Sequence, residues 1–296
     1  MATNSKLSKV ADKSPQRNIE AENLNDFVAA ITGGGRMKQH SEHDTLRKTE
    51  RHIALFMKNT EKNRFSNAVL FNQGAVVLEK IKEKEDGDYI HASRVNTPHG
   101  NYVLAQAPKP DTVVDFCRMI WQLRVNTIHK GRFRVRTLAV RVENEFITHY
   151  ELKIENYNEK SGEEKERTVN VVAVSGWNAD KVDKSFSAKT VVQAVHDAEA
   201  MQQSMLTHVE KAGVEAPLLI HGCSGIRRTG CFALACIFNK QVHANKEISL
   251  IGYIDHVRQF RYGSMFIFLL EVIVHFIAET GAIKPGSPEF KSTIQV

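Results

Sequence analysis

The chain has 296 residues, of which 42% are hydrophobic, so it can bury the core of one large globular domain. No apolar run reaches the roughly 18–20 residues of a membrane span. The best candidate, residues 265–277, is interrupted by Glu271 and His275 and predicts a buried helix. The amino terminus lacks the apolar core of a secretory signal. Four cysteines without disulfide-scaffold or zinc-site spacing favour a reduced, cytoplasmic protein that needs no metal or organic cofactor.

The formal net charge of +6 is compatible with a negatively charged partner, such as nucleic acid, anionic lipid or an acidic peptide. A solvated surface with excess lysine explains a charge of this size equally well. The charge alone therefore does not identify a partner.

The predicted domain extends from residue 23 to residue 282, between a disordered polar tail (residues 1–22) and a polar C-terminal tail (residues 283–296). Leu24 to Ile31 predicts a short helix that three consecutive glycines end. A second amphipathic helix is expected from about Ser41 to Lys58. Both helices are expected to pack against the domain.

The middle of the chain contains several strand-like segments. They lie at residues 75–81, 88–93, 102–108, 133–142, 145–155 and 167–174. A helix that includes Trp121 is expected after the third of them, and a charged hairpin turn before the last. Two further helices are predicted at residues 187–209 and 248–261.

The stretch from Pro217 to Lys240 carries the strongest functional signal. It contains an apolar run with the length of a buried parallel strand, then a Gly-rich turn, then an apolar helix. This order forms an anion cradle, because free backbone N–H groups and the positive end of the helix dipole converge on one point. Arg227 and Arg228 stand where the helix starts, and a guanidinium group suits the bidentate grip of a phosphate.

The ten residues from His221 to Gly230 resemble the signature loop of the cysteine-dependent protein tyrosine phosphatases, which reads His-Cys-Ser-Ala-Gly-Ile-Gly-Arg-Thr-Gly. In register, the matching positions are His221, Gly225, Ile226, Arg228, Thr229 and Gly230. Other segments that resemble the family are Asn63–Asn67, Asp88–Ser93, Tyr102–Pro108, Trp177–Asp180 and the pair Arg258 and Arg261. The resemblance covers most of residues 63–278. It implies an α/β, tyrosine-phosphatase-like fold, with a twisted mixed sheet flanked by helices.

The same resemblance implies how a phosphate would be held. Arg228 would clamp it, together with the loop residues Ser224, Gly225, Ile226, Arg227 and Thr229. Phe65 stands where the family has a tyrosine that lines the phosphotyrosine cleft, and a phenyl ring can stack there equally. Asn67 replaces an aspartate that anchors the substrate backbone, and Arg261 would support the loop from behind.

Three positions that the family uses for catalysis are changed. Gly222 stands at the position of the nucleophilic cysteine, and Cys223 follows one residue late. Ala179 takes the position of the general acid, with Asp180 one residue beyond it. Phe266 stands where a glutamine places the hydrolytic water. A loop with a glutamate and a Lys-Cys-x-x-Tyr-Trp-Pro run, which the family has at this point of the chain, is missing after residue 128.

Three hypotheses follow. The first is a pseudophosphatase that binds phosphotyrosine, or another acidic group, on a partner protein, and binds no nucleic acid and spans no membrane. The second is a slow phosphatase that uses Cys223, which a glycine insertion and a compensating deletion would bring into line, with Asp180 as its candidate acid. The third is a structural or adaptor role through an unrelated surface, with a vestigial cleft; this hypothesis gains if Arg227, which replaces a loop glycine of the family, fills the pocket or strains its backbone. Three simultaneous substitutions favour the first hypothesis over hydrolysis.

Overall fold

The computed structural model describes residues 21–31, 51–79, 87–123, 133–156, 166–177, 185–209, 216–245, 247–261, 263, 266–288 and 290–291.

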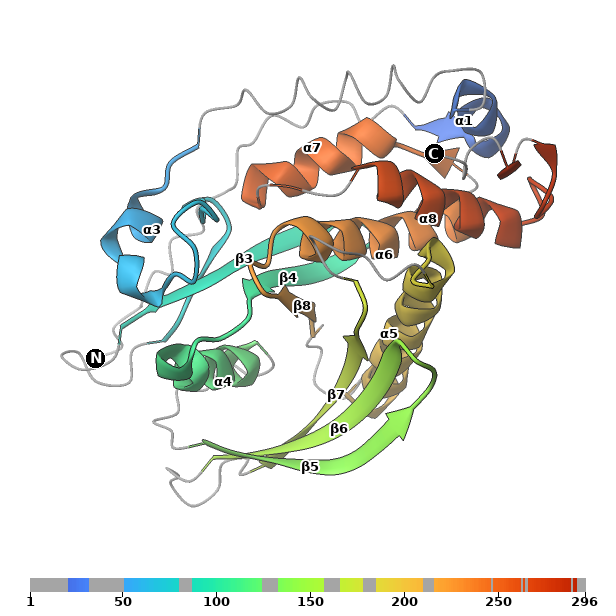
Figure 1. The fold of residues 1–296 in the computed structure, drawn as a ribbon. Coiled ribbons are helices and arrows are strands. Elements are labelled where there is room, and N and C mark those ends of the chain that lie inside the picture. Colours follow the sequence, from blue (N-terminus) through green and yellow to red (C-terminus); the bar gives the residue numbers. More distant parts are fainter. Residues whose placement is uncertain are drawn as a thin grey trace, which may run out of the picture.

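A four-stranded mixed sheet lies at the centre of the molecule (Figure 1). Its strands, in spatial order, are β2 (Ala75–Val77), β3 (Tyr89–Thr97), β4 (Gly100–Gln106) and β8 (Leu218–Gly222). The first three are antiparallel, whereas β4 and β8 run parallel, with Gln106 opposite Gly222. The carboxyl ends of β4 and β8 therefore lie side by side, which is where parallel strands place ligand sites.

Helices cover both faces of this sheet. Successive side chains of β4 point to opposite faces, and because both sets are apolar, each face packs against helices. Tyr102 and Leu104 join a core formed with α6 (Arg227–Asn245), α7 (Leu250–Phe260) and α8 (Phe266–Glu279). Val103 and Ala105 point the other way and pack against Phe116 and Met119 of α4 (Val113–Gln122). Figure 1 shows α6 above the strands, α7 and α8 above α6, and α4 below.

A second sheet has three antiparallel strands, β5 (Phe133–Val142), β6 (Ile147–Asn156) and β7 (Glu166–Val174). It packs beside α5 (Ala188–Val209), where His149 Nε2 lies 2.8 Å from the Asp197 carboxylate. These strands and helices agree closely with the segments expected from the sequence. Within the described residues, however, the strands fall into separate sheets rather than one continuous sheet.

The remaining elements are short. They are β1 (Glu22–Asn23), α1 (Leu24–Ala30), α3 (Ala54–Lys58), the 3₁₀ turns η3 (Thr60–Lys62) and η4 (Pro110–Thr112), and β9 (Glu247–Ile248). The helix expected from about Ser41 to Lys58 was predicted too long: residues 51–53 are described and are not helical, so the helix starts only at Ala54 of α3, and residues 41–50 lie outside the described residues.

The two ends of the expected domain differ in how they pack. Glu22 pairs with Ile248, so the described chain begins in a short β ladder. Within the expected C-terminal tail, Ile283 is buried and Phe290 packs against His275, with ring centroids 5.2 Å apart. The expected buried helix at residues 265–277 is α8, and among the described helices none is long and apolar enough to cross a membrane.

Candidate functional site

The Gly-rich turn joins β8 to α6 in four residues, 223–226. At the strand end, the Ala107 N–H donates to the Gly222 carbonyl at 2.8 Å. The first helical hydrogen bond runs from Gly230 N–H to the Ile226 carbonyl, also at 2.8 Å. Between these two points, the backbone N–H groups of residues 224–229 have no acceptor among the described residues. The turn therefore presents open N–H donors at the positive end of a 19-residue helix.

Gly225 holds this turn against the central sheet. Its φ of 66° lies in the left-handed region, which favours glycine. A Cβ at this position would lie 2.2 Å from the Ala105 carbonyl oxygen of β4. The close approach of two backbones fixes the height of the turn above the strand, and only glycine permits it.

Arg261, at the C-terminal cap of α7, supports the turn from behind. Its side chain is 1% exposed, and its Nε donates to the Gly225 carbonyl at 2.7 Å. One terminal nitrogen donates to the Ser224 carbonyl at 3.3 Å. Burial lowers the pKa of Arg261 to about 9, so the guanidinium group stays charged at neutral pH. These hydrogen bonds place Arg261 behind the turn, as the resemblance to the phosphatase family implied.

His91 on β3 completes this support, and its role was not foreseen from the sequence. Its Nδ1 lies 3.0 Å from an Arg261 nitrogen and its Nε2 lies 2.7 Å from the Ala68 carbonyl. A guanidinium group can only donate hydrogen bonds, so Nδ1 of His91 accepts the bond from Arg261. Nε2 therefore carries the proton and donates a hydrogen bond to the Ala68 carbonyl. Burial, reinforced by the charge of Arg261, lowers the pKa of His91 to about 3.

Arg228 is the second residue of α6 and is partly exposed. Its Nη1 donates to the carbonyl of Trp177. The Trp177 ring is buried and contacts Phe186 and Phe268, with centroid separations of 5.7 and 5.2 Å, and these two phenylalanine rings also contact each other. An aromatic cluster thus fixes the carbonyl that orients Arg228.

Three residues of the turn and its ends, Gly222, Cys223 and Arg227, determine which side chains are available for chemistry at this site. Gly222 offers no side chain, and a Cβ on it would meet the Thr229 hydroxyl at 3.0 Å. Cys223 is exposed. Arg227 is also exposed, and its Cγ lies 3.9 Å from where a Cβ on Gly263 would stand. The stem of Arg227 therefore runs past Gly263 at the rim.

Phe65, the expected aromatic wall, is 39% exposed. The segment that carries it is tied to the end of β4 by Gln106, whose amide donates to the Lys62 carbonyl at 3.1 Å and whose oxygen accepts from the Arg64 N–H at 2.8 Å. Gln106 is opposite Gly222 in the sheet, so one side chain links the wall to the strand beside the turn. Gln106 lies in the Tyr102–Pro108 segment that resembles the family, but its link to the Phe65 segment was not predicted from the sequence.

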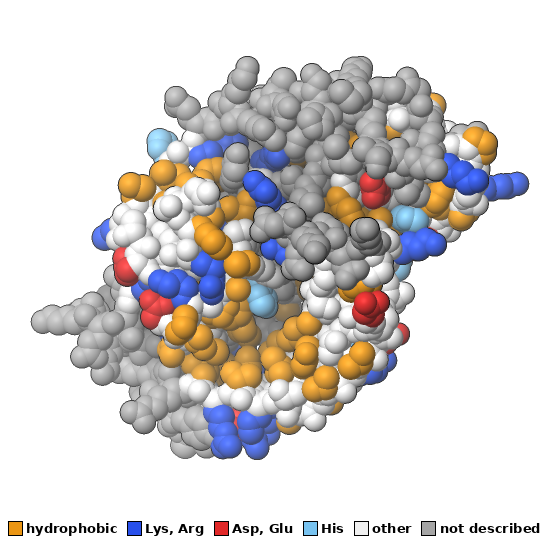
Figure 2. All heavy atoms as spheres, in the orientation of Figure 1, with side chains coloured by type: hydrophobic (Ala, Val, Ile, Leu, Met, Phe, Trp, Pro, Cys, Tyr) orange, Lys and Arg blue, Asp and Glu red, His pale blue; other side chains and the backbone are white. Residues whose placement is uncertain are grey.

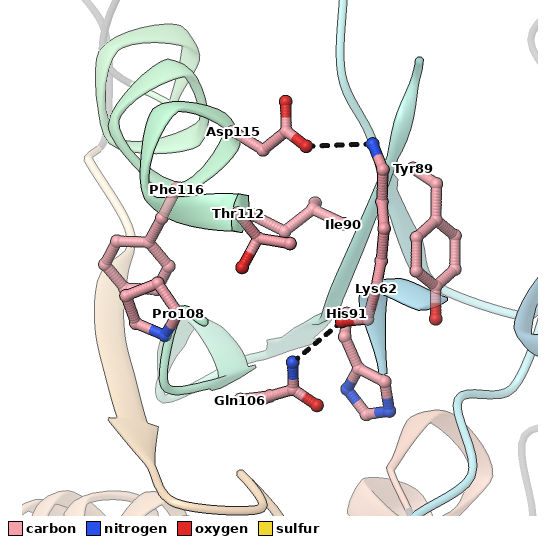
Figure 3. Close-up of a pocket in the computed structure, with 9 residues that line it drawn as sticks. All are labelled: Lys62, Tyr89, Ile90, His91, Gln106, Pro108, Thr112, Asp115 and Phe116. Atoms are coloured by element: carbon pink, nitrogen blue, oxygen red, sulfur yellow. Dashed lines mark hydrogen bonds and ion pairs between the residues drawn. The ribbon is translucent and has the colours of Figure 1, made fainter. Parts of the chain in front are cut away.

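A small pocket lies behind Gln106 (Figure 3). Figure 3 shows Lys62 extended across it, with its amino group on Asp115 at 2.9 Å and its carbonyl on Gln106. The hydroxyl of Tyr89 is likewise bonded, to Asn63 Oδ1 at 2.5 Å. These polar groups bind one another across the pocket, and their hydrogen bonds and ion pair hold the segment that carries Phe65 in place.

The family model for protein-tyrosine phosphatase matches residues 59–130 and 126–274. The chain belongs to the protein-tyrosine phosphatase family.

Individual relatives are more distant. Human tyrosine-protein phosphatase non-receptor type 7 is 27% identical over an alignment of 229 residues, and the match covers 69% of this chain and 59% of the relative. Human receptor-type tyrosine-protein phosphatase alpha is 23% identical over an alignment of 226 residues, and the match covers 68% of this chain and 27% of the relative. The chain thus spans about 59% of the length of the first of these phosphatases.

The fold agrees with that of solved phosphatase domains. The catalytic domain of human protein tyrosine phosphatase non-receptor type 18 superposes with a TM-score of 0.66 and 18% identity, covering 86% of this chain and 97% of that one. This likeness shows the tyrosine-phosphatase fold. It confirms the α/β architecture expected from the sequence.

The structure gives different amounts of detail at the three positions that differ from the family's catalytic residues. Gly222 ends β8, as shown above. Ala179 and Asp180 lie outside the described residues. Phe266 is the first residue of α8, and its side chain lies outside the described part. Within that described part, no group of three or more His, Cys, Asp or Glu side chains is arranged to hold a metal ion.

Proposed function

We propose that this chain is a pseudophosphatase, which binds a phosphorylated tyrosine on a partner protein and does not hydrolyse it. The observation that carries the proposal is Gly222, which ends β8 at the nucleophile position while the open N–H donors of residues 224–229 remain. A covalent step at phosphorus needs a thiolate directed into the cradle. Glycine supplies none.

The binding half of the site supports this function. Open backbone N–H groups at a helix N-terminus attract an anion. Arg228 lies at that N-terminus, and a guanidinium group holds phosphate oxygens in a bidentate manner. Arg261 holds the carbonyls of Ser224 and Gly225 from behind, which leaves the N–H groups of the turn without competition from this side chain, because a guanidinium group only donates.

The rim supports an aromatic ligand. Phe65 is partly exposed on a segment that Gln106 anchors, so its ring is available to stack on a phosphotyrosine ring at little cost in side-chain entropy. Arg227 is exposed beside Gly263 and adds positive charge at the rim. That placement argues against the hypothesis of a vestigial cleft plugged by Arg227.

Catalysis is weakened at three separate steps. Gly222, Ala179 and Phe266 replace the nucleophile, the general acid and the water-positioning amide that the family uses. Each of these groups contributes on the order of 10² to 10⁴ in rate, and the nucleophile more. A neighbouring residue could replace one of them, whereas the loss of three leaves no useful rate.

None of the four cysteines, all of which lie within the described residues, forms a disulfide bond, and this supports a reducing, cytoplasmic location for this function.

A phosphotyrosyl-peptide titration by calorimetry tests the proposal. We expect saturable binding of the phosphorylated peptide and much weaker binding of its unphosphorylated form. Arg228→Ala removes charge-assisted hydrogen bonds and is expected to lower the affinity at least about tenfold. Arg141→Ala is the matched control, because it also removes one guanidinium group but from β5 of the separate three-stranded sheet, where Arg141 pairs with Glu143. Equal affinity for both peptides, or full binding by Arg228→Ala, would refute the proposal.

One observation favours a second candidate, a slow phosphatase that uses Cys223. That thiol is exposed and directly follows the nucleophile position. This candidate predicts a low turnover of an aryl phosphate that Cys223→Ser abolishes. Turnover no faster than buffer alone removes it.

A further inference from the structure

Strand β5 presents a hydrogen-bonding edge that no described strand covers. It pairs with β6 on one side, and β6 in turn pairs with β7. Every residue of β5 after Phe133 is exposed. An edge strand of this kind carries a row of backbone N–H and C=O groups that can pair with another extended segment.

One face of β5 is apolar. Val135 lies opposite Ile154, Val140 opposite Tyr150 and Val142 opposite Thr148. These partners lie on one face of β6, because residues two apart share a face. The β5 valines are 47%, 55% and 70% exposed.

An irregularity in β5 places these valines together. Val135 and Val140 are five residues apart, which in a regular strand would put them on opposite faces. The pairing shifts between Thr137 and Ala139, so one extra residue enters β5 there. That shift returns Val140 and Val142 to the face of Val135.

The opposite face of β5 is basic. Arg134, Arg136 and Arg141 lie opposite Glu155, Lys153 and His149. Arg136 forms an ion pair with Glu155, and Arg141 lies 3.5 Å from Glu143, yet their side chains remain 45% and 68% exposed. The strand itself, FRVRTLAVRV, has no acidic residue.

We propose that β5 is a docking site for an extended segment of a partner protein in which apolar residues alternate with acidic ones. The segment would add as a further strand, with backbone hydrogen bonds to the free edge. Its apolar side chains would contact the valine face, and its acidic side chains would face the arginines. This inference does not depend on the proposed function of the phosphate site.

Charge excludes a second copy of the chain as the favoured occupant. Two β5 strands side by side would bring arginine rows together with no carboxylate between them in either strand. Like charges on neighbouring strands are destabilising. Acidic side chains on the added strand would remove that repulsion.

The docking strand lies apart from the phosphate cradle. Figure 1 shows β5 at the edge of the three-stranded sheet, beyond β6 and β7 from α5, whereas β8 belongs to the central sheet. In the same orientation, Figure 2 shows hydrophobic side chains around a hollow in the lower half of the molecule and basic side chains along the lower edge. A partner could occupy β5 while the cradle holds a phosphate.

Fluorescence anisotropy with three labelled ten-residue peptides tests the proposal. One peptide alternates valine and glutamate, one alternates valine and lysine, and one keeps the glutamates but carries two central prolines, which cannot donate to a ladder. We expect one-to-one binding of the valine–glutamate peptide, no binding of the lysine peptide, and at least about tenfold weaker binding of the proline peptide. The double variant Arg134→Glu/Arg141→Glu should also bind about tenfold more weakly.

A second variant guards against misfolding. Val135→Thr/Val140→Thr keeps the β-branched shape that strands favour while removing apolar contact, so it should fold and still bind more weakly. A melting temperature equal to that of the unmodified chain would show that both variants are folded. Equal binding of the proline peptide would overturn the proposal, because charge attraction alone would then explain it. So would sedimentation as a dimer that the threonine variant dissociates.

Discussion

At the scale of single residues, His91 is the contact that we expect to make the Gly-rich turn between β8 and α6 sensitive to acid. It is 3% exposed and accepts a hydrogen bond from Arg261, which in turn holds the loop carbonyls. A protonated imidazole could not accept that bond and would repel the guanidinium group. The support behind the loop therefore requires neutral His91.

The pH dependence of stability follows from this pKa. The folded pKa of His91, about 3, lies below its ordinary value of 6.5, so the unfolded chain takes up a proton first as the pH falls. The stabilisation is fully present above pH 6.5 and is lost as the pH falls toward 3. Between neutral pH and about pH 5 this amounts to about 2 kcal/mol.

We predict that His91→Asn removes this acid sensitivity. Asparagine keeps an acceptor for Arg261 but does not titrate. Urea unfolding at neutral pH and at about pH 5 measures the effect, as the difference between variant and unmodified chain. If both chains lose the same free energy of unfolding on acidification, His91 is not the titrating group.

Gly225 offers a second prediction at this scale. Gly225→Ala is expected to abolish phosphopeptide binding and to destabilise the fold, because the new Cβ would meet the Ala105 carbonyl oxygen at 2.2 Å. Gly281→Ala is the matched control, since Gly281 also has a positive φ, 79°, but has nothing within 4 Å of its added Cβ. The control should cost about 1 kcal/mol and leave binding intact. Equal losses of stability in the two variants would show that the contact with β4 is unimportant.

At the scale of elements, Gln106 couples the Phe65 segment to the central sheet. Gln106→Leu removes its bonds to Lys62 and Arg64, so we predict several-fold weaker phosphopeptide binding from a loosened cleft wall. Gln122→Leu is the control. Gln122 likewise makes one donated and one accepted backbone bond, to Val77 and Glu79, but it joins α4 to the far edge of the sheet. Calorimetric titration of both variants should separate them, and an equal effect of the two on affinity would contradict this coupling.

At the scale of the whole molecule, the features that could be predicted from the sequence are those that depend on residues close together in the chain. The strand, glycine turn and helix around the cradle were predictable because they lie within 28 consecutive residues, 218–245, and their hydrophobic periods are clear, although the helix continues five residues beyond its expected end at Lys240. The bond between His91 and Arg261 was not, since it joins side chains 170 residues apart. The one-residue shift in β5 escaped prediction for a related reason: alternation alone places its valines on both faces.

The basic charge can also be located at this scale. A net charge of +6 gave no position for a partner. The structure distributes arginines to two places, the N-terminus of α6 and one face of β5. Both places are suited to acidic groups, one to a phosphate and the other to carboxylates.

The central claim, binding without hydrolysis, is tested most directly by ³¹P NMR of a phosphotyrosyl peptide mixed with the purified chain. The account predicts that the phosphotyrosine resonance shifts or broadens on addition of protein, while inorganic phosphate grows no faster than in peptide alone. A phosphate signal that accumulates and disappears with Cys223→Ser would contradict the claim, as would a phosphotyrosine resonance that the protein leaves unchanged.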